Sequence, residues 1–169
     1  MSTIPVDWES ALEMHGAFWN WYKIATKIPW ANRSPNMPSE ITEAMVCLCT
    51  GAKLIKTGNG DILLPNGQIG EVKGTVSQKD DLSSFSPSEK FDKLFFVHMA
   101  PGDNNFYWVY DLHMGRKDIE KIKVNRNETF GDHAAQGRRP RFSIIASIIR
   151  PNHIIPTWKV DIINKKVIS

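Results

Sequence analysis

One stretch decides the fold: Asp61-Ile-Leu-Leu-Pro-Asn-Gly-Gln-Ile-Gly-Glu-Val-Lys-Gly-Thr-Val76. Two runs rich in branched apolar residues flank the triplet Pro65-Asn66-Gly67. An Asn-Gly pair readily takes the positive φ that a tight turn between antiparallel strands requires. We therefore expect a β-hairpin over residues 61–76, and the rest of the chain is interpreted around it.

The hairpin carries three residues whose chemistry fits a metal-dependent reaction on a phosphate. Side chains two apart on a strand share a face, so Glu71 and Lys73 project together, while Asp61 begins the partner strand. Carboxylate oxygens are the ligands that Mg²⁺ prefers, and a neighbouring lysine can orient or activate water and stabilise developing charge. Asp61 and Glu71 are therefore candidate ligands of one or two Mg²⁺, with Lys73 as a catalytic residue.

The acid-x-Lys tripeptide is a weak signal by itself. The composition predicts about 1.5 such tripeptides by chance, and the chain contains one. The alternative interpretation is a surface hairpin whose charges only form ion pairs. The context favours the metal site, because Asp61 stands at a strand start and a preceding helical segment bears Glu40 and Glu43.

Two helices are expected before the hairpin. Apolar residues recur at three- and four-residue spacing from Trp8 to Ile28, and Asp7 is a suitable N-cap for this helix. A second helix opens at Ser39, which we expect to act as its N-cap, with acidic residues in the first turn. Gly51 is expected to end it.

After the hairpin the chain alternates between apolar and polar segments. Residues 77–91 are polar, whereas residues 94–99 and 106–112 have the composition of strands around a turn at 101–104. Together with the hairpin these strands predict a meander of at least four. The other expected elements are a short helix over 116–122, an irregular polar segment over 125–139 and a strand over 142–149.

The composition excludes several classes of protein. Apolar residues make up 41% and charged residues 23%, as in a globular domain rather than a disordered or fibrous chain. No apolar run approaches the roughly 20 residues of a membrane helix and no signal-peptide pattern is present, so we expect a cytoplasmic protein without a membrane partner.

Two cysteines, Cys47 and Cys49, are too few for a disulfide framework or a Cys-based zinc site. Neither a histidine zinc motif nor a phosphate-binding Gly-Lys-Ser/Thr motif occurs.

The positive charge is concentrated late in the chain. Residues 115–141 carry eight Lys or Arg against four Asp or Glu, a balance that suits phosphate. Arginine pairs with guanine, Asn or Gln with adenine and Glu with cytosine, so the candidate DNA-reading residues are Arg126, Asn127, Glu128, His133, Gln136, Arg138, Arg139 and Arg141. An exposed loop that holds only phosphates is the alternative. Lys79 is a weaker candidate for the DNA backbone.

These residues resemble the PD-(D/E)xK nuclease superfamily, with Asp61 as its Asp and Glu71-Val72-Lys73 as its (D/E)xK. The chain departs from the pattern at Gly60, where the family has a proline, and this leaves the metal ligand intact. Other segments resemble small type II restriction endonucleases, namely 33–43, 84–87, 127–132 and 137–143. Within that group the chain is most similar to the short Bsp-type enzymes that cut GCNGC.

The resemblance implies an α/β fold with a PD-(D/E)xK nuclease core, in which a central mixed β-sheet is flanked by α-helices. It implies a single endonuclease domain over 1–169, with a catalytic core at about 39–112 and a DNA-recognition segment at about 113–143. The implied activity is that of a type II restriction endonuclease, which hydrolyses double-stranded DNA with Mg²⁺ at a short G/C-rich palindrome.

The resemblance also implies roles for residues ahead of the hairpin. Glu43 matches the helix glutamate that lies near the metal in such enzymes, with Glu40 as the other candidate. Arg33 and Asn36 are candidate DNA contacts from the matching segment. A palindromic target calls for a homodimer, in which each subunit cuts one strand. A cognate DNA methyltransferase is expected as a genetic partner only.

Two other functions fit the same residues. One is a structure-selective repair or junction nuclease of the same superfamily, which would read DNA shape and need fewer base-reading side chains. The other is a non-catalytic DNA-binding module whose Asp, Glu and Lys are structural. The module would bind DNA without Mg²⁺ and would never nick it, which separates it from both nucleases.

Overall fold

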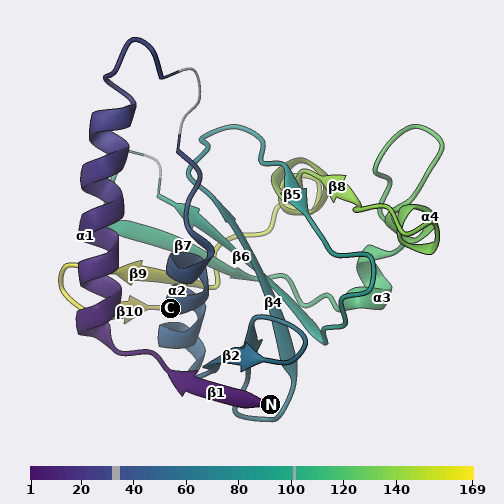
Figure 1. The fold of residues 1–169 in the computed structure, drawn as a ribbon, viewed down its shortest axis with the longest axis horizontal. Helices are drawn as coiled ribbons and strands as arrows, with labels where there is room; N and C mark the ends of the chain where they lie inside the picture. Colours follow the sequence, from purple (N-terminus) through teal and green to yellow (C-terminus); the bar gives the residue numbers. More distant parts are fainter. Residues whose placement is uncertain (32–34, 101) are drawn as a thin grey trace.

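The computed structural model describes residues 1–31, 35–100 and 102–169. At its centre is a large curled sheet (Figure 1). Its eight strands, in spatial order, are β1 (Ser2–Pro5), β2 (Lys53–Thr57), β3 (Ile62–Leu63), β4 (Ile69–Thr75), β6 (Lys93–Met99), β7 (Phe106–Asp111), β9 (Trp158–Asp161) and β10 (Lys166–Ile168). Neighbouring strands are antiparallel except for β4 and β6, which run parallel. The predicted mixed α/β character is confirmed.

The predicted hairpin is confirmed as β3 and β4. Ile62 lies opposite Gly70 and Leu63 opposite Ile69, and the turn closes with Leu64 N donating to Gln68 O at 2.9 Å. Within this turn only Gly67 has a positive φ, at +84°. Asn66 contributes differently, because its side-chain oxygen accepts a hydrogen bond from Gln68 N at 3.1 Å.

The predicted meander is wrong at one step. After β4 the chain does not turn back but crosses over through residues 76–92, so that Glu71 pairs with Leu94 and Val72 with Phe95 in parallel register. The crossover is anchored by Phe85 and Phe91, which are buried. Although residues 77–91 are mostly polar, these two aromatic side chains hold the segment against the sheet.

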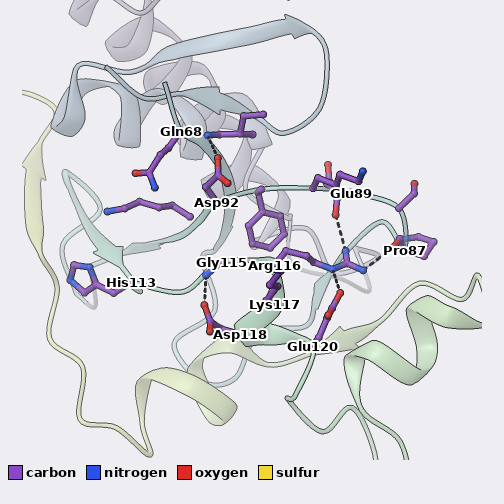
Figure 2. Close-up of a pocket in the computed structure, with 15 residues that line it drawn as sticks. Gln68, Pro87, Glu89, Asp92, His113, Gly115, Arg116, Lys117, Asp118 and Glu120 are labelled. Carbon is purple, nitrogen blue, oxygen red and sulfur yellow. Dashed lines mark hydrogen bonds and ion pairs between the residues drawn. The ribbon is translucent and has the colours of Figure 1, made fainter. Parts of the chain in front are cut away.

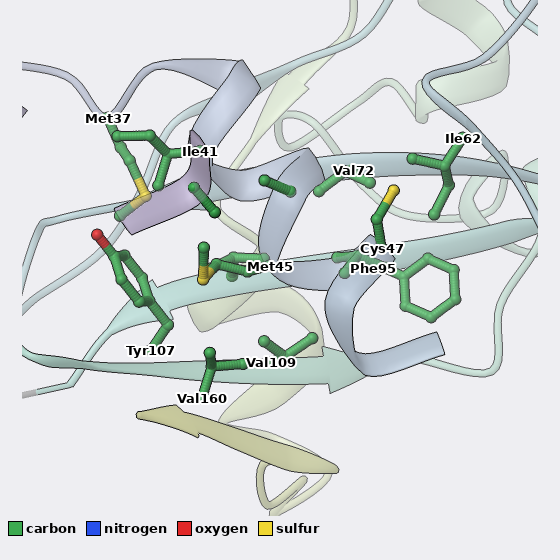
Figure 3. Packing of buried hydrophobic residues seen from close by; sticks show 14 of the residues in the cluster. Met37, Ile41, Met45, Cys47, Ile62, Val72, Phe95, Tyr107, Val109 and Val160 are labelled. Atoms are coloured by element: carbon green, nitrogen blue, oxygen red, sulfur yellow. The ribbon is translucent and has the colours of Figure 1, made fainter. Parts of the chain in front are cut away.

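Helices α1 (Trp8–Ala25) and α2 (Ser39–Thr50) cover one face of the sheet. Figure 3 shows α2 residues such as Met45 packed against Val72 and Phe95 of the strands. Asp7 caps α1 as predicted, since its carboxylate accepts from Ser10 N at 2.8 Å.

The ends of these two helices differ in part from the predictions. Helix α1 stops at Ala25 rather than Ile28, and at this end the Thr26 hydroxyl donates to Tyr22 O at 2.9 Å. The predicted N-cap role of Ser39 is wrong, since Ser39 is already helical and Pro38 precedes it. Gly51 ends α2 at φ +71°, as predicted.

The opposite face of β6 carries a second apolar cluster. Along β6, Phe95 and Val97 face the helices, whereas Leu94 and Phe96 face this second cluster. Its other members come from β5 (Ser83–Ser84), α3 (Arg116–Ile119), α4 (Phe130–Ala135), β8 (Arg141–Phe142), the π-helix η1 (Ile145–Ile149) and the segments between them. In Figure 1 these elements gather at the end of the sheet away from α1.

Two predictions for this region are wrong. The segment 125–139 is not irregular throughout, because α4 begins after Thr129, whose hydroxyl accepts from Asp132 N at 3.2 Å. The sequence predicts a strand over 142–149, but β8 ends at Phe142 and residues 145–149 form the π-helix η1. Its first turn is held by the buried Asp81 carboxylate, which accepts from Ile145 N at 2.9 Å. Across the described ranges, no helix has both the length and the apolar character needed to span a bilayer.

Candidate metal-binding active site

The hairpin brings Asp61 against strand β4. Asp61 Oδ2 accepts a hydrogen bond from Val72 N at 2.7 Å, and Asp61 N donates to Gly70 O at 3.0 Å. Gly60 has φ +75°, and a Cβ there would lie 2.2 Å from Cγ2 of Ile69. A proline, whose φ is held near −65°, could not adopt this conformation. The glycine at this position, where the resemblance led us to expect a proline, therefore has a conformational reason.

Glu71 and Lys73 lie on the same face of β4, as their spacing predicts. Lys73 Nζ forms an ion pair with Glu71 Oε1 and lies 5.1 Å from the centre of the Phe85 ring. Glu71 has 0% exposed area, and within the described part of the chain neither of its carboxylate oxygens accepts a hydrogen bond. A buried carboxylate with a single ion pair and no further hydrogen bond is costly in free energy and points to a ligand.

Glu89 completes the group and was missed from the sequence. One oxygen from each of Asp61, Glu71 and Glu89 lies within 4.8 Å of the others. Glu89 comes from the crossover segment, whose run of Ser, Pro, Glu and Lys gives no periodicity that relates it to the hairpin. Only the parallel pairing of β4 with β6 returns this segment to the site, so no local sequence signal could have identified it.

The electrostatics of the group follow from burial and crowding. Burial, and then the nearby Asp61 carboxylate, raise the pKa of Glu71 to about 8. Burial also raises the pKa of Asp61, although the hydrogen bond from Val72 N works against it. Burial alone would lower the pKa of Lys73, but the Glu71 carboxylate and its neighbours raise it above the ordinary lysine value. Lys73 is therefore an ammonium at neutral pH.

Glu43 lies at the edge of this group rather than inside it. It is half-buried on α2, and burial together with the Asp61 charge raises its pKa to about 7. Glu40, the other predicted candidate, is exposed and accepts a hydrogen bond from the Ser39 hydroxyl at 3.3 Å. Of the two, Glu43 is the one whose charge interacts with Asp61.

The three carboxylates suit a hard divalent cation. Mg²⁺ binds oxygens at about 2.0–2.1 Å, so two ligand oxygens of one ion lie roughly 3–4 Å apart. The oxygens of Asp61, Glu71 and Glu89 are already within 4.8 Å of one another, and small side-chain movements would bring them to that spacing. The described residues form no hydrogen bond with the Glu71 oxygens, which fits a role of Glu71 as a ligand of this cation.

A cavity of about 1040 Å³ has Glu89 on its wall (Figure 2). Its lining carries four Lys or Arg and four Asp or Glu, and among the basic residues Lys90 and Lys117 are exposed. Lys93, also on the wall, forms an ion pair with Asp111 at 2.7 Å. Of these side chains, the exposed Lys90 and Lys117 are suited to contact a phosphate backbone.

The predicted DNA-reading residues fall into two groups. Glu128 accepts hydrogen bonds from Asn125 at 2.8 Å and pairs with His133 and Arg138. The hydrogen bonds from Asn125 and Arg138 lower the pKa of Glu128 to about 2. The predicted residues that are exposed are Asn36, Lys79, Arg126, Asn127, Gln136, Arg138, Arg139 and Arg141. Arg33 lies outside the described residues.

Comparison with known proteins covers the whole of this site. Residues 6–151 match the sequence profile of a family described as Bsp6I restriction endonuclease. The chain is also 42% identical over 139 residues to the type II restriction enzyme Bsp6I of Bacillus sp. (strain RFL6), over 82% of this chain and 79% of that protein. The profile match includes the three carboxylates, Lys73 and the predicted recognition segment.

Proposed function

The chain belongs to the Bsp6I restriction endonuclease family, and from this premise we propose that it cleaves double-stranded DNA through a Mg²⁺-dependent PD-(D/E)xK site. Membership of the family makes it a site-specific endonuclease. The proposal adds the chemistry: Asp61 and Glu71 as metal ligands and Lys73 as the catalytic cation. The observation that carries it is Glu71, a fully buried carboxylate beside two others, for which the described residues supply only the Lys73 ammonium as a partner.

Each side chain has a separate task in this proposal. Asp61 and Glu71 would hold one or two Mg²⁺, which when bound supply positive charge for the scissile phosphate and a more acidic water. Asp61 is itself oriented by the hydrogen bond from Val72 N. Lys73, kept protonated by the surrounding carboxylates, can donate a hydrogen bond to the attacking water or to a phosphate oxygen. In this proposal Lys73 orients the attacking water and stabilises charge on the phosphate, and it does not remove a proton.

The recognition surface of the proposal lies beyond the cavity. The exposed arginines Arg138, Arg139 and Arg141 favour a G/C-rich site, because arginine pairs bidentately with guanine. A short palindrome such as GCNGC, read on both strands, would require a homodimer. In a cell such an enzyme would be accompanied by a cognate DNA methyltransferase, which protects the same site.

The direct test is cleavage of phage DNA by the wild-type enzyme and by Asp61→Asn, each with Mg²⁺ and with EDTA. We expect discrete bands only from the wild-type enzyme with Mg²⁺, since the amide is a poor metal ligand. Asp103→Asn is the matched control, because Asp103 lies in the β6–β7 turn, where its Oδ1 accepts from Asn105 N at 3.1 Å. It should cleave like the wild-type enzyme.

Other outcomes would select another function. Full activity of Asp61→Asn would exclude the proposed site. Cleavage restricted to branched DNA would favour a repair nuclease, whereas intact DNA under every metal condition would favour a binding module. Sequencing the ends of discrete fragments would give the recognition site and show whether it is G/C-rich and palindromic.

A further inference from the structure

Arg116, at the start of α3, is bound almost entirely to the backbone of the crossover segment. Its side chain is 14% exposed. Nη1 donates to Glu89 O at 3.0 Å and to Ser86 O at 3.2 Å, and Nη2 donates to Pro87 O at 2.8 Å. Figure 2 shows the guanidinium pointing at this turn. One planar fork thus fixes three carbonyls of residues 86–89, a geometry that a lysine ammonium cannot reproduce.

Further contacts hold the guanidinium itself in place. Nε donates to Glu120 Oε1 at 3.0 Å, and the guanidinium carbon lies 4.5 Å from the centre of the Phe130 ring. Phe130 is fully buried in the second apolar cluster. The ion pair with Glu120 and the packing on Phe130 therefore fix the orientation of the guanidinium independently of its hydrogen bonds to the crossover segment.

The other end of the same turn is fixed to the hairpin. Asp92 N donates to Ile69 O at 2.8 Å, and Ile69 N donates to Asp92 Oδ2 at 2.9 Å. Ile69 is two residues before Glu71 on β4. Glu89 thus stands between two anchored points, Arg116 on one side and β4 on the other. One of its carboxylate oxygens lies within 4.8 Å of oxygens of Asp61 and Glu71, and Oε2 accepts from Ser86 N at 3.4 Å.

The charges at the site give Glu89 a reason to be there. The three carboxylates face one ammonium, Lys73, among the residues that the structure describes within the group. Three carboxylates beside one ammonium leave an excess of acidic groups, which a bound divalent cation would offset. Glu71 adds an independent indication of a ligand, because it is fully buried and both its oxygens are without hydrogen bonds inside the described ranges.

We propose that Glu89 is a third carboxylate ligand of the metal and that Arg116 is the positioning residue that holds it there. This inference rests on the proposed metal-dependent function and extends it to two residues outside the hairpin motif. Arg116 acts through the backbone of residues 86–89 and does not touch the metal. Its contribution should therefore depend on the carboxylate of Glu89.

The test measures binding of Mn²⁺ alone to the DNA-free enzyme, by the electron paramagnetic resonance signal of the free ion. We expect Glu89→Gln to raise the Kd for Mn²⁺ roughly 10-fold or more, and Arg116→Gln to raise it by a similar factor, as loss of a supporting residue does at other metal sites. The double variant should be no weaker than Glu89→Gln, because both changes remove the same ligand.

Two further variants separate positioning from folding. Arg150→Gln is the matched control, since Arg150 forms an exposed ion pair with Asp80 at 2.7 Å away from the site, and its Mn²⁺ affinity should equal that of the wild type. Arg116→Lys keeps the charge and the packing but not the fork, and should also weaken Mn²⁺ binding. Urea unfolding of every variant shows which variants are folded. If Arg116→Gln is not folded, the Mn²⁺ affinity of Arg116→Lys tests the positioning role instead.

The outcomes distinguish this inference from the function on which it rests. If Asp61→Asn loses Mn²⁺ binding while Glu89→Gln binds like the wild type, the third ligand is wrong and the metal site stands. If Asp61→Asn also binds like the wild type, the metal site itself is wrong. Additive losses in the Glu89→Gln, Arg116→Gln double variant would overturn the positioning role of Arg116.

Discussion

Two buried carboxylates ten positions apart have opposite surroundings. Asp81, 8% exposed, accepts four hydrogen bonds: from the hydroxyls of Ser83 at 2.7 Å and Ser143 at 2.9 Å, and from the backbone of Ile144 at 3.1 Å and Ile145 at 2.9 Å. Glu71, 0% exposed, accepts none in the described part of the chain and has only the ion pair with Lys73.

The difference separates a structural carboxylate from a functional one. Burying either group removes it from water at a similar cost, which hydrogen bonds can offset. For Asp81 the donors come from the crossover and from the first turn of η1, so the carboxylate ties two distant segments together. For Glu71 the described residues supply only the Lys73 ammonium, and the remaining capacity of its oxygens is available to a cation. Sites of this kind trade stability for function.

Glu71→Gln is the sharpest test of the comparison. We expect cleavage to fall by roughly 10³-fold, since loss of metal charge stabilisation costs several kcal/mol in the transition state. The free energy of unfolding should stay the same or rise by about 1 kcal/mol, because a neutral amide relieves the crowding of three carboxylates. Single-turnover cleavage and urea unfolding measure the two effects. A variant that cleaves normally but unfolds easily would reverse the assignment.

Asp81→Ala should show the opposite behaviour. It leaves two backbone N–H groups and two hydroxyls without their acceptor, so we expect a loss of about 3 kcal/mol in the free energy of unfolding. Asp81→Asn, which retains one acceptor oxygen, should lose less. Urea unfolding followed by tryptophan fluorescence measures both. If Asp81→Ala is as stable as the wild type, the four hydrogen bonds do not hold η1 to the crossover.

The same contrast explains what could be predicted from the sequence. The hairpin, the shared face of Glu71 and Lys73, and the Asp7 cap were predictable, because each depends on residues within a few positions of one another. Turn chemistry and strand periodicity decide such features locally.

The missed features all depend on contacts between distant segments. The parallel crossover is held by Phe85 and Phe91, the third carboxylate Glu89 arrives through that crossover, and the π-helix begins where Asp81 accepts from Ile145 N. A β-branched run such as 142–149 favours a strand by propensity. Here the Asp81 carboxylate, from another part of the chain, overrides that preference, and no local sequence pattern predicts this contact.

The smallest effect is expected at two adjacent serines of β5, which repeat the comparison on neutral groups. The Ser83 hydroxyl donates to Asp81 at 2.7 Å, whereas the Ser84 hydroxyl is buried and, within the described ranges, has no hydrogen-bond partner. Ser83→Ala should lose about 1–2 kcal/mol in the free energy of unfolding, because the hydrogen bond is to a carboxylate. Ser84→Ala should be neutral or stabilising by a few tenths of a kcal/mol, since it removes an unpaired polar group. The two residues are neighbours on one strand. Equal effects of the two substitutions on the free energy of unfolding would therefore show that β5 is sensitive to any change, and that the hydrogen bond to Asp81 does not distinguish Ser83 from Ser84.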